Sequence, residues 1–334
     1  MNRMLGKLEN FLSKRCFIAS RIEALTPDAS TRSFFRVWTE SVSVIVCVYP
    51  DDELGRTQFN AYLDVTNLFL KANLPVARII SYDESSLIIA HEDFGDLILR
   101  DKLDLSDEKE REEIFDKAIA LIAKIQAATA LAHELNSVAS RLRFDTEKLF
   151  WELNFFKTHY FSSLLKSPLS KEEDEKLSEE FLSLSRMLDA RAMVLTHRDY
   201  HLSNLMFFND EIKIIDHQDA RIGSVSYDLV SLLLDRITEI PSEKWLSEKR
   251  KIFLEERRKL GFEDLNEEDF IEEFHLQSIQ RCLKAVGTFS YQIALRGKSG
   301  YSVFIKPMIN VVLRACQLLG VFPFLREKLS RSLQ

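Results

Sequence analysis

At 334 residues with 46% hydrophobic side chains, the chain is long enough for two lobes and has the ordinary composition of a globular protein. Its formal net charge of −7 excludes the basic footprint of a nucleic-acid-binding protein and gives no reason to expect an anionic membrane as a partner. The N-terminal residues lack the apolar core of a signal peptide, and no uninterrupted apolar stretch approaches the length of a membrane span. Four cysteines without metal-site spacing indicate reduced thiols in the cytoplasm: Cys16, Cys47, Cys282 and Cys316.

The first ninety residues have the pattern of a small sheet with two helices. Amphipathic spacing predicts helices over 1–20 and 56–71. Strands are expected where β-branched and aromatic residues gather, at 22–25, 34–38, 42–49, 77–82 and 86–90. These elements together predict a sheet-bearing lobe.

The turn-rich segment 26–33 lies between two of these strands. Small hydroxyl residues in such a loop can wrap phosphates with backbone N–H groups and side-chain hydroxyls. Ser30, Thr31 and Arg32 are the candidates, and a plain hairpin turn is the alternative. The position of the segment at the start of a sheet-bearing lobe favours the phosphate loop.

The strand over 86–90 runs into a polar segment with the pattern of a hinge between lobes. A hinge offers backbone donors and acceptors to an adenine edge, and no particular side chain is needed for that contact. Glu92, Asp93 and Phe94 are the candidate residues, and an ordinary strand-to-helix loop is the alternative.

Helical periodicity dominates the rest of the chain. Helices are expected over 107–126, 145–159, 171–188, 224–236, 243–259, 266–295 and 301–319. Strands followed by helices predict an α+β protein with an N-lobe over 1–95 and a helical C-lobe over 96–334. A ligand is expected between the lobes, where such proteins form clefts.

One stretch combines acids and an amide at a spacing typical of phosphoryl transfer. Asp199 precedes Asn204 by five residues, and two apolar runs over 205–208 and 212–215 lead to Asp216. Asp199 would accept or orient the proton of an attacking hydroxyl, and Asn204 and Asp216 would hold Mg²⁺ against nucleotide phosphates. The alternative is that these residues are polar loop ends without a shared role.

Three further residues have open interpretations. Asp228, near the start of a predicted helix, either braces the catalytic loop by accepting backbone N–H bonds or is an ordinary acid of a first helical turn. Arg281 and Lys284 either meet substrate oxygens or belong to a solvated edge or a structural ion pair.

These features resemble the aminoglycoside phosphotransferase family, whose fold is similar to that of protein kinases. The general motifs are the His197-Arg198-Asp199 run with Asn204, and Asp216. More specific strings resemble bacterial N-acetylmuramate/N-acetylglucosamine anomeric kinases: DASTRSFFRV (28–37), HRDYH (197–201), DHQDA (216–220), YDLVSLL (227–233) and QRCLKAVGTF (280–289).

The resemblance implies a cytoplasmic enzyme that uses ATP and Mg²⁺ to phosphorylate the C1 hydroxyl of a small-molecule sugar in cell-wall recycling. It assigns Asp199 as the catalytic base and Asn204 and Asp216 as metal ligands. It also assigns residues 30–32 to the phosphate loop and residues 92–94 to the hinge that meets adenine. The candidates for acceptor contacts are Arg198, His201, Asp219 and Arg281.

The chain departs from this pattern at two positions. Kinase-like folds carry a lysine on the third strand, but the segment 44–49 has none, so Arg32 or Arg36 becomes the candidate cation. His217 stands where the resemblance leads us to expect an aromatic residue. The alternatives are a phosphotransferase for aminoglycoside or choline-type acceptors, or a nucleotide-binding pseudokinase.

Overall fold

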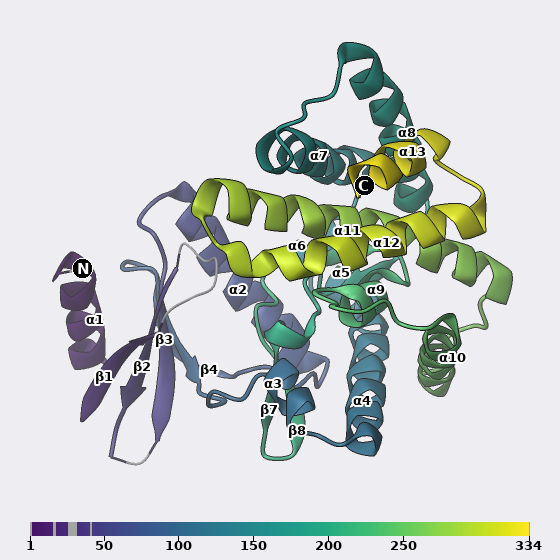
Figure 1. The fold of residues 1–334 in the computed structure, drawn as a ribbon. Coiled ribbons are helices and arrows are strands. Elements are labelled where there is room, and N and C mark those ends of the chain that lie inside the picture. Colours follow the sequence, from purple (N-terminus) through teal and green to yellow (C-terminus); the bar gives the residue numbers. More distant parts are fainter. Residues whose placement is uncertain (1, 16–17, 26–31, 41, 334) are drawn as a thin grey trace. The chain divides into compact units, whose positions relative to one another are not determined.

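The computed structural model describes residues 2–15, 18–25, 32–40 and 42–333. These residues form two compact units (Figure 1). Unit 1 comprises Met1–Arg111, Ala130–Ala139 and Leu202–Ala220, and unit 2 comprises Glu112–Thr129, Ser140–His201 and Arg221–Gln334. Ser30, Thr31 and Cys16 lie outside the described residues, and the lobe boundary at residue 95 stays a prediction.

Unit 1 contains a five-stranded antiparallel sheet in the order β1-β2-β3-β5-β4. Its strands are β1 (Arg21–Leu25), β2 (Ser33–Trp38), β3 (Ser43–Val48), β4 (Ile79–Asp83) and β5 (Ile88–Glu92). Its other elements are α1 (Asn2–Lys14), α2 (Glu53–Lys71), α3 (Leu99–Asp104), most of α5 (Thr129–Glu134), the 3₁₀ turn Leu202–Asn204, β7 (Leu205–Phe208) and β8 (Glu211–Ile214). The sheet that the sequence predicted is thus confirmed.

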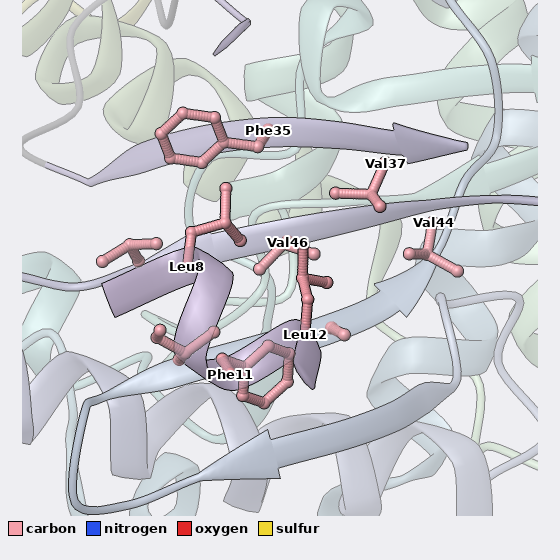
Figure 2. Close-up of a cluster of buried hydrophobic side chains, with 10 residues drawn as sticks. Leu8, Phe11, Leu12, Phe35, Val37, Val44 and Val46 are labelled. Atoms are coloured by element: carbon pink, nitrogen blue, oxygen red, sulfur yellow. The ribbon is translucent and has the colours of Figure 1, made fainter. Parts of the chain in front are cut away.

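The helix α1 packs on one face of this sheet (Figure 2). Leu8, Phe11 and Leu12 recur at helical spacing and form one apolar stripe. The stripe meets the alternate residues of the strands that point to the same face, such as Val37 and Val46. Helical and strand periodicities together therefore bury this part of the core.

The opposite face of the sheet belongs to α2. Asp52 caps that helix, because its side chain accepts a hydrogen bond from Gly55 N at 2.7 Å. Phe59 and Tyr62 of α2 share a buried cluster with Cys47 of β3 and with Tyr49, which directly follows that strand. Arg32 also reaches this face, because its guanidinium lies 5.9 Å from the ring centre of Tyr49.

Unit 2 is helical. Its helices are α4 (Glu108–Ala127), whose first turn lies in unit 1, α6 (Val138–Arg141), which crosses the division, α7 (Thr146–Lys157), α8 (Lys171–Asp189), α9 (Tyr227–Leu234), α10 (Glu243–Lys259), α11 (Glu267–Arg296), α12 (Ser302–Leu319) and α13 (Pro323–Ser332). A π-helical segment (Thr158–Leu164) follows α7, and a 3₁₀ turn (Ser299–Tyr301) precedes α12. The short strands β6 (Val194–Thr196) and β9 (Arg221–Gly223) pair with each other.

The helix α11 runs through the centre of unit 2, with α12 alongside it (Figure 1). Most side chains of its first two-thirds are buried, including polar ones such as Gln280 and Arg281. Gly287 allows the close approach of α7, since a Cβ built there would lie 2.6 Å from Phe156 Cα. The helices and strands expected over long periodic segments are therefore confirmed, as is the α+β class.

Two composition-based expectations have different outcomes. Cys47, Cys282 and Cys316 are free and buried, as expected for reduced thiols. The segment Ser299–Leu319, in contrast, is long and apolar enough to cross a membrane by length and composition, although Lys306 and Arg314 interrupt its apolar residues. Core helices pass the same test, and Ile305, Met308 and Ile309 of α12 are buried.

Candidate active site

The hairpin β7–β8 brings two candidate metal ligands to one end of a ribbon in unit 1. Its register pairs Leu205 with Ile214, and its tight turn places Asn209 and Asp210 at φ 51° and 60°, as hairpin turns require. At the open end, Ile215 N donates a hydrogen bond to Asn204 O at 3.1 Å. Asn204 and Asp216 therefore flank the same end of the hairpin.

Asp216 lies in a polar environment. Its Oδ1 atom accepts hydrogen bonds from Arg32 Nη2 at 2.6 Å and Gln218 Nε2 at 3.1 Å. The Asp216 side chain is 34% exposed and its arginine partner only 11% exposed. Asp216 also adopts φ 62°, a backbone conformation that costs roughly 1 to 3 kcal/mol when the surroundings enforce it. Such strain is typical of functional positions.

Oxygen donors of this kind fit a hard divalent cation. Asn204 offers an amide oxygen and Asp216 a carboxylate, and Mg²⁺ binds through few protein oxygens while keeping water or phosphate ligands. Among the described residues, no three His, Cys, Asp or Glu side chains form a cluster that could hold a metal. One amide oxygen and one carboxylate from the protein suit a metal that is also bound by nucleotide phosphates.

His217 points into the packing of unit 1. Its ring stacks on Phe69 at 5.3 Å and contacts Tyr62 at 5.0 Å, both measured between ring centroids. Its Nε2 atom forms a 2.7 Å hydrogen bond with Thr66 Oγ1 of α2. The imidazole thus fills the place that the sequence pattern assigned to an aromatic residue.

The hinge candidates comprise the last residue of β5, Glu92, and the two residues after it, all in unit 1. Arg36 contacts Asp93 Oδ2 through Nε and Asp96 Oδ1 through Nη1, both at 2.7 Å, and it donates to Gly95 O at 3.0 Å. Glu92 pairs with Arg78 at 2.6 Å. These contacts fix the backbone of the segment.

A cavity of about 690 Å³ lies beside this segment, a volume suited to a small ligand. The described residues that line it are Val42, Ser43, Arg78, Ile79, Ile80, Glu92, Asp93, Phe94, Gly95 and Phe208. Arg32, Asn204 and Asp216 are not among them. The contact between the hinge and adenine stays a prediction.

In unit 2, the candidate base Asp199 is surrounded by positive charge. Lys284 Nζ donates to its Oδ1 atom at 3.0 Å, and Arg281 Nη2 lies 3.6 Å from the same atom. Arg198 Nε lies 3.7 Å from Oδ2. Burial alone would raise the pKa of Asp199, but the charges of Lys284, Arg198 and Arg281 outweigh it and hold the pKa well below its usual value.

Asp228 braces the loop that carries Asp199. Its carboxylate accepts hydrogen bonds from His197 N at 2.6 Å and Arg198 N at 3.1 Å. These bonds hold Arg198 at φ 84° and confirm the bracing role over that of an ordinary first-turn acid. Burial raises the pKa of Asp228 to about 7, although both hydrogen bonds oppose that rise.

The two basic residues of α11 both lie near Asp199 but differ in their closest partners. Arg281 forms a buried pair with Asp235 at 2.7 Å and also donates to Ser231 Oγ at 3.1 Å. Lys284 instead meets Asp199. Arg281 thus forms a structural ion pair. The sequence analysis named Lys284 only as part of a basic pair and did not include it among the candidate site residues.

The remaining acceptor candidates fall in both units. His201 follows Asp199 in unit 2 and donates its backbone N–H to Asp199 O at 3.0 Å. Burial lowers the pKa of His201 to about 4, so its imidazole is neutral near pH 7. Asp219 lies in unit 1, within the turn closed by a bond from Ala220 N to His217 O. The acceptor contacts of these residues stay predictions.

Comparison with known proteins shows the family of this chain. Residues 21–262 match the model of the phosphotransferase enzyme family, which is more than half of the chain. The chain belongs to the phosphotransferase enzyme family. As a member, it is a phosphotransferase that acts on a hydroxyl group.

Two curated relatives of this phosphotransferase are N-acetylmuramate/N-acetylglucosamine kinases. The protein from Neisseria meningitidis serogroup B is 27% identical over 290 residues, which cover 86% of this chain and 83% of the relative. The protein from Pseudomonas aeruginosa is 26% identical over 281 residues, which cover 82% and 77%.

Solved structures share the fold. Aminoglycoside phosphotransferase APH(2'')-Ib, bound to ADP, aligns with a TM-score of 0.61 at 15% identity and covers 92% of this chain and 96% of its own. Amicoumacin kinase hAmiN, bound to AMP-PNP and Ca²⁺, aligns with a TM-score of 0.62 at 14% identity and covers 94% and 96%. The kinase-like fold expected from the sequence is thus confirmed.

Proposed function

We propose that this phosphotransferase transfers the γ-phosphoryl group of Mg·ATP to the anomeric hydroxyl of N-acetylmuramate or N-acetylglucosamine. The similarity to curated amino-sugar kinases over more than four-fifths of the chain carries the proposal. The product would be a sugar 1-phosphate for cell-wall recycling, made in the cytoplasm. The solved neighbours that hold ADP, or AMP-PNP with Ca²⁺, support the use of ATP and a divalent metal.

The surroundings of Asp199 suit such an acceptor. Lys284 and Arg281 lie within 3.6 Å of its carboxylate, so the side chains that flank the proposed base bring positive charge to it. A neutral sugar or one with a carboxylate is compatible with that charge. A cationic aminoglycoside or choline would be repelled by it.

The reaction needs one proton acceptor and one in-line displacement. The sugar hydroxyl oxygen forms a bond to the γ-phosphorus while the bond to the leaving ADP oxygen breaks. The transition state is loose, so the hydroxyl keeps its proton until late in the reaction. Asp199, whose pKa is held low, therefore acts mainly by orienting the hydroxyl and accepts the proton as the new bond forms.

The charge of the phosphates also needs compensation. Asn204 and Asp216 would hold the magnesium ion, which when bound neutralises charge on the transferring phosphoryl group. Asp228 keeps the loop of Asp199 in place through its two backbone hydrogen bonds. These roles follow from donor chemistry and from the order Asp199, Asn204 and Asp216 along the chain.

A transfer assay tests the proposal. The protein is incubated with Mg·ATP and, separately, N-acetylmuramate, N-acetylglucosamine, glucose, choline and kanamycin, and the product linkage is read by phosphorus NMR. A 1-phosphate from an N-acetylated sugar is the expected result. Product from choline or kanamycin alone would show that the acceptor belongs to a different chemical class. Bound nucleotide without transfer to any acceptor would favour the pseudokinase.

A further inference from the structure

The third strand of the sheet lacks the lysine that kinase-like folds use to contact nucleotide phosphates. The strand β3 reads SVIVCV, and its residues Ile45 and Cys47 alternate with those buried against α1. Cys47 instead joins the cluster with Phe59 and Tyr62 of α2. A thiol thus occupies the face of the strand from which a phosphate-contacting cation would extend.

A cation reaches this place from the residue directly before the neighbouring strand β2. Phe34 of β2 is paired with Cys47 of β3, and Arg32 precedes Phe34 by two residues. Its guanidinium lies 5.3 Å from the ring centre of Phe34 and 5.9 Å from that of Tyr49. The same guanidinium contacts Asp216 at 2.6 Å. Arg32 therefore spans from the sheet to the candidate metal ligand within unit 1.

The helix α2 uses its inward face differently from the helix of a kinase, where a glutamate pairs with the strand lysine. Here the inward residues are aromatic or neutral, such as Phe59, Tyr62 and Thr66. Asp64 of α2 is bound to Ser137 Oγ at 2.5 Å and Val138 N at 2.8 Å. The ion pair between strand and helix is thus replaced by one between Arg32 and Asp216.

Arg36, the other candidate cation, already has a structural role. It contacts Asp93 and Asp96 at 2.7 Å and the carbonyl of Gly95 at 3.0 Å. Its guanidinium therefore stabilises the segment after β5. This difference in partners separates the two arginines that the sequence left as alternatives.

We propose that Arg32, directly before β2, replaces the third-strand lysine and binds the nucleotide phosphates beside the metal that Asp216 would hold. The planar guanidinium can bind phosphate oxygens in a bidentate way, and it keeps its charge when partly buried. A partly buried ion pair adds little to the free energy of unfolding by itself. The pair between Arg32 and Asp216 is therefore better explained by a role in binding. The proposal rests on the use of ATP proposed above, but not on which sugar is the acceptor.

Nucleotide affinity tests the proposal without any acceptor. Titration calorimetry in Mg²⁺ compares adenosine, ADP and AMP-PNP binding to the wild type and to Arg32→Ala. We expect the variant to lose about tenfold or more of its affinity for ADP and AMP-PNP, as for a lost charge-assisted hydrogen bond. Adenosine affinity should stay unchanged, because adenosine has no phosphates. Arg21→Ala, which removes an exposed arginine of β1, is the control.

Two further variants separate binding from folding. Arg32→Lys keeps the charge and should retain most of the affinity for ADP. The double variant Arg32→Ala/Cys47→Lys returns a lysine to the third strand and should recover part of the loss. Unchanged ADP affinity in Arg32→Ala, or an equal loss for adenosine and ADP, would overturn the proposal. If the protein binds ADP normally but does not phosphorylate an amino sugar, only the proposed acceptor is refuted.

Discussion

At the scale of single residues, the structure explains why Asp199 can stay ionised although it is partly buried. Three cations lie within 3.7 Å of its carboxylate, and the closest is Lys284. Burial favours the neutral acid, whereas each cation favours the carboxylate, and the cations prevail. A carboxylate that is always ionised can accept a hydrogen bond from a substrate hydroxyl at any pH near neutrality.

Removal of that charge should affect turnover and leave the fold intact. We expect Asp199→Asn to lower kcat by at least about a hundredfold, the lower range for general acid–base groups. Steady-state kinetics with the acceptor identified in the panel measures this effect, and thermal unfolding checks the fold. Asp210→Asn, at an exposed turn with φ 60°, is the matched control. Near-normal kcat in Asp199→Asn would refute the assignment.

Lys284 should set the pH dependence of the reaction. Its replacement by glutamine removes the nearest positive charge, so the pKa of Asp199 should rise. Activity that needs the carboxylate is lost as pH falls through that pKa, and the acid limb of kcat/KM should therefore move to higher pH. Lys284→Arg should keep the limb near its wild-type position, and exposed Lys306→Gln is the control. Superimposable profiles for the wild type and Lys284→Gln would contradict this role.

At the scale of elements, the contact between α7 and α11 depends on one glycine. A Cβ at Gly287 would lie 2.6 Å from Phe156 Cα and 2.9 Å from Phe156 N. Backbone atoms in packed helices cannot move aside as a flexible side chain can. The segment that presents Lys284 is thus held by close packing three residues further along α11.

Substitution of this glycine should therefore destabilise unit 2. We expect Gly287→Ala to lower the free energy of unfolding by about 1 to 3 kcal/mol, the usual cost of overpacking, despite the higher helix propensity of alanine. Urea denaturation measures the change. Gly300→Ala is the matched control, because nothing lies within 4 Å of a Cβ built there. Equal stability of Gly287→Ala and the wild type would show that the two helices separate easily.

At the scale of the whole molecule, the two units hold different parts of the candidate site. Unit 1 holds Arg32, Asn204, Asp216 and the hinge segment, and unit 2 holds Asp199 with its cations. The catalytic stretch crosses from one unit to the other between His201 and Leu202. Nucleotide binding can therefore be tested separately from acceptor chemistry.

Ligand-induced stabilisation provides such a test for Asp216. A ligand at a hundred times its Kd stabilises a protein by about 2.7 kcal/mol. We expect Mg·ATP to raise the melting temperature of the wild type but to have little effect on Asp216→Ala, because the carboxylate for the metal is gone. Each variant is compared with its own melting temperature without ligand, and exposed Glu211→Ala is the control. A full thermal shift in Asp216→Ala would exclude Asp216 as a metal ligand.

Local pattern was sufficient to predict much of this protein from its sequence. The long helices and the strands of the sheet follow from periodicity, and the hairpin follows from two apolar runs around Asn209 and Asp210. A hairpin brings its two ends together whatever surrounds it, so the proximity of Asn204 and Asp216 was also predictable. Short elements such as α3, α5 and β9 were missed, because three to six residues carry too little periodic signal.

Only the tertiary structure decided the partners of the charged residues. Arg32 meets Asp216 across 184 positions of sequence, and Lys284 meets Asp199 across 85. Periodicity tells which face of an element is buried, but the partner across that face depends on how the elements pack. His217 shows the same limit, since its contacts with Tyr62, Thr66 and Phe69 exist only once α2 covers it. The sequence by itself thus determined the local arrangement of the site, and the fold decided its electrostatics.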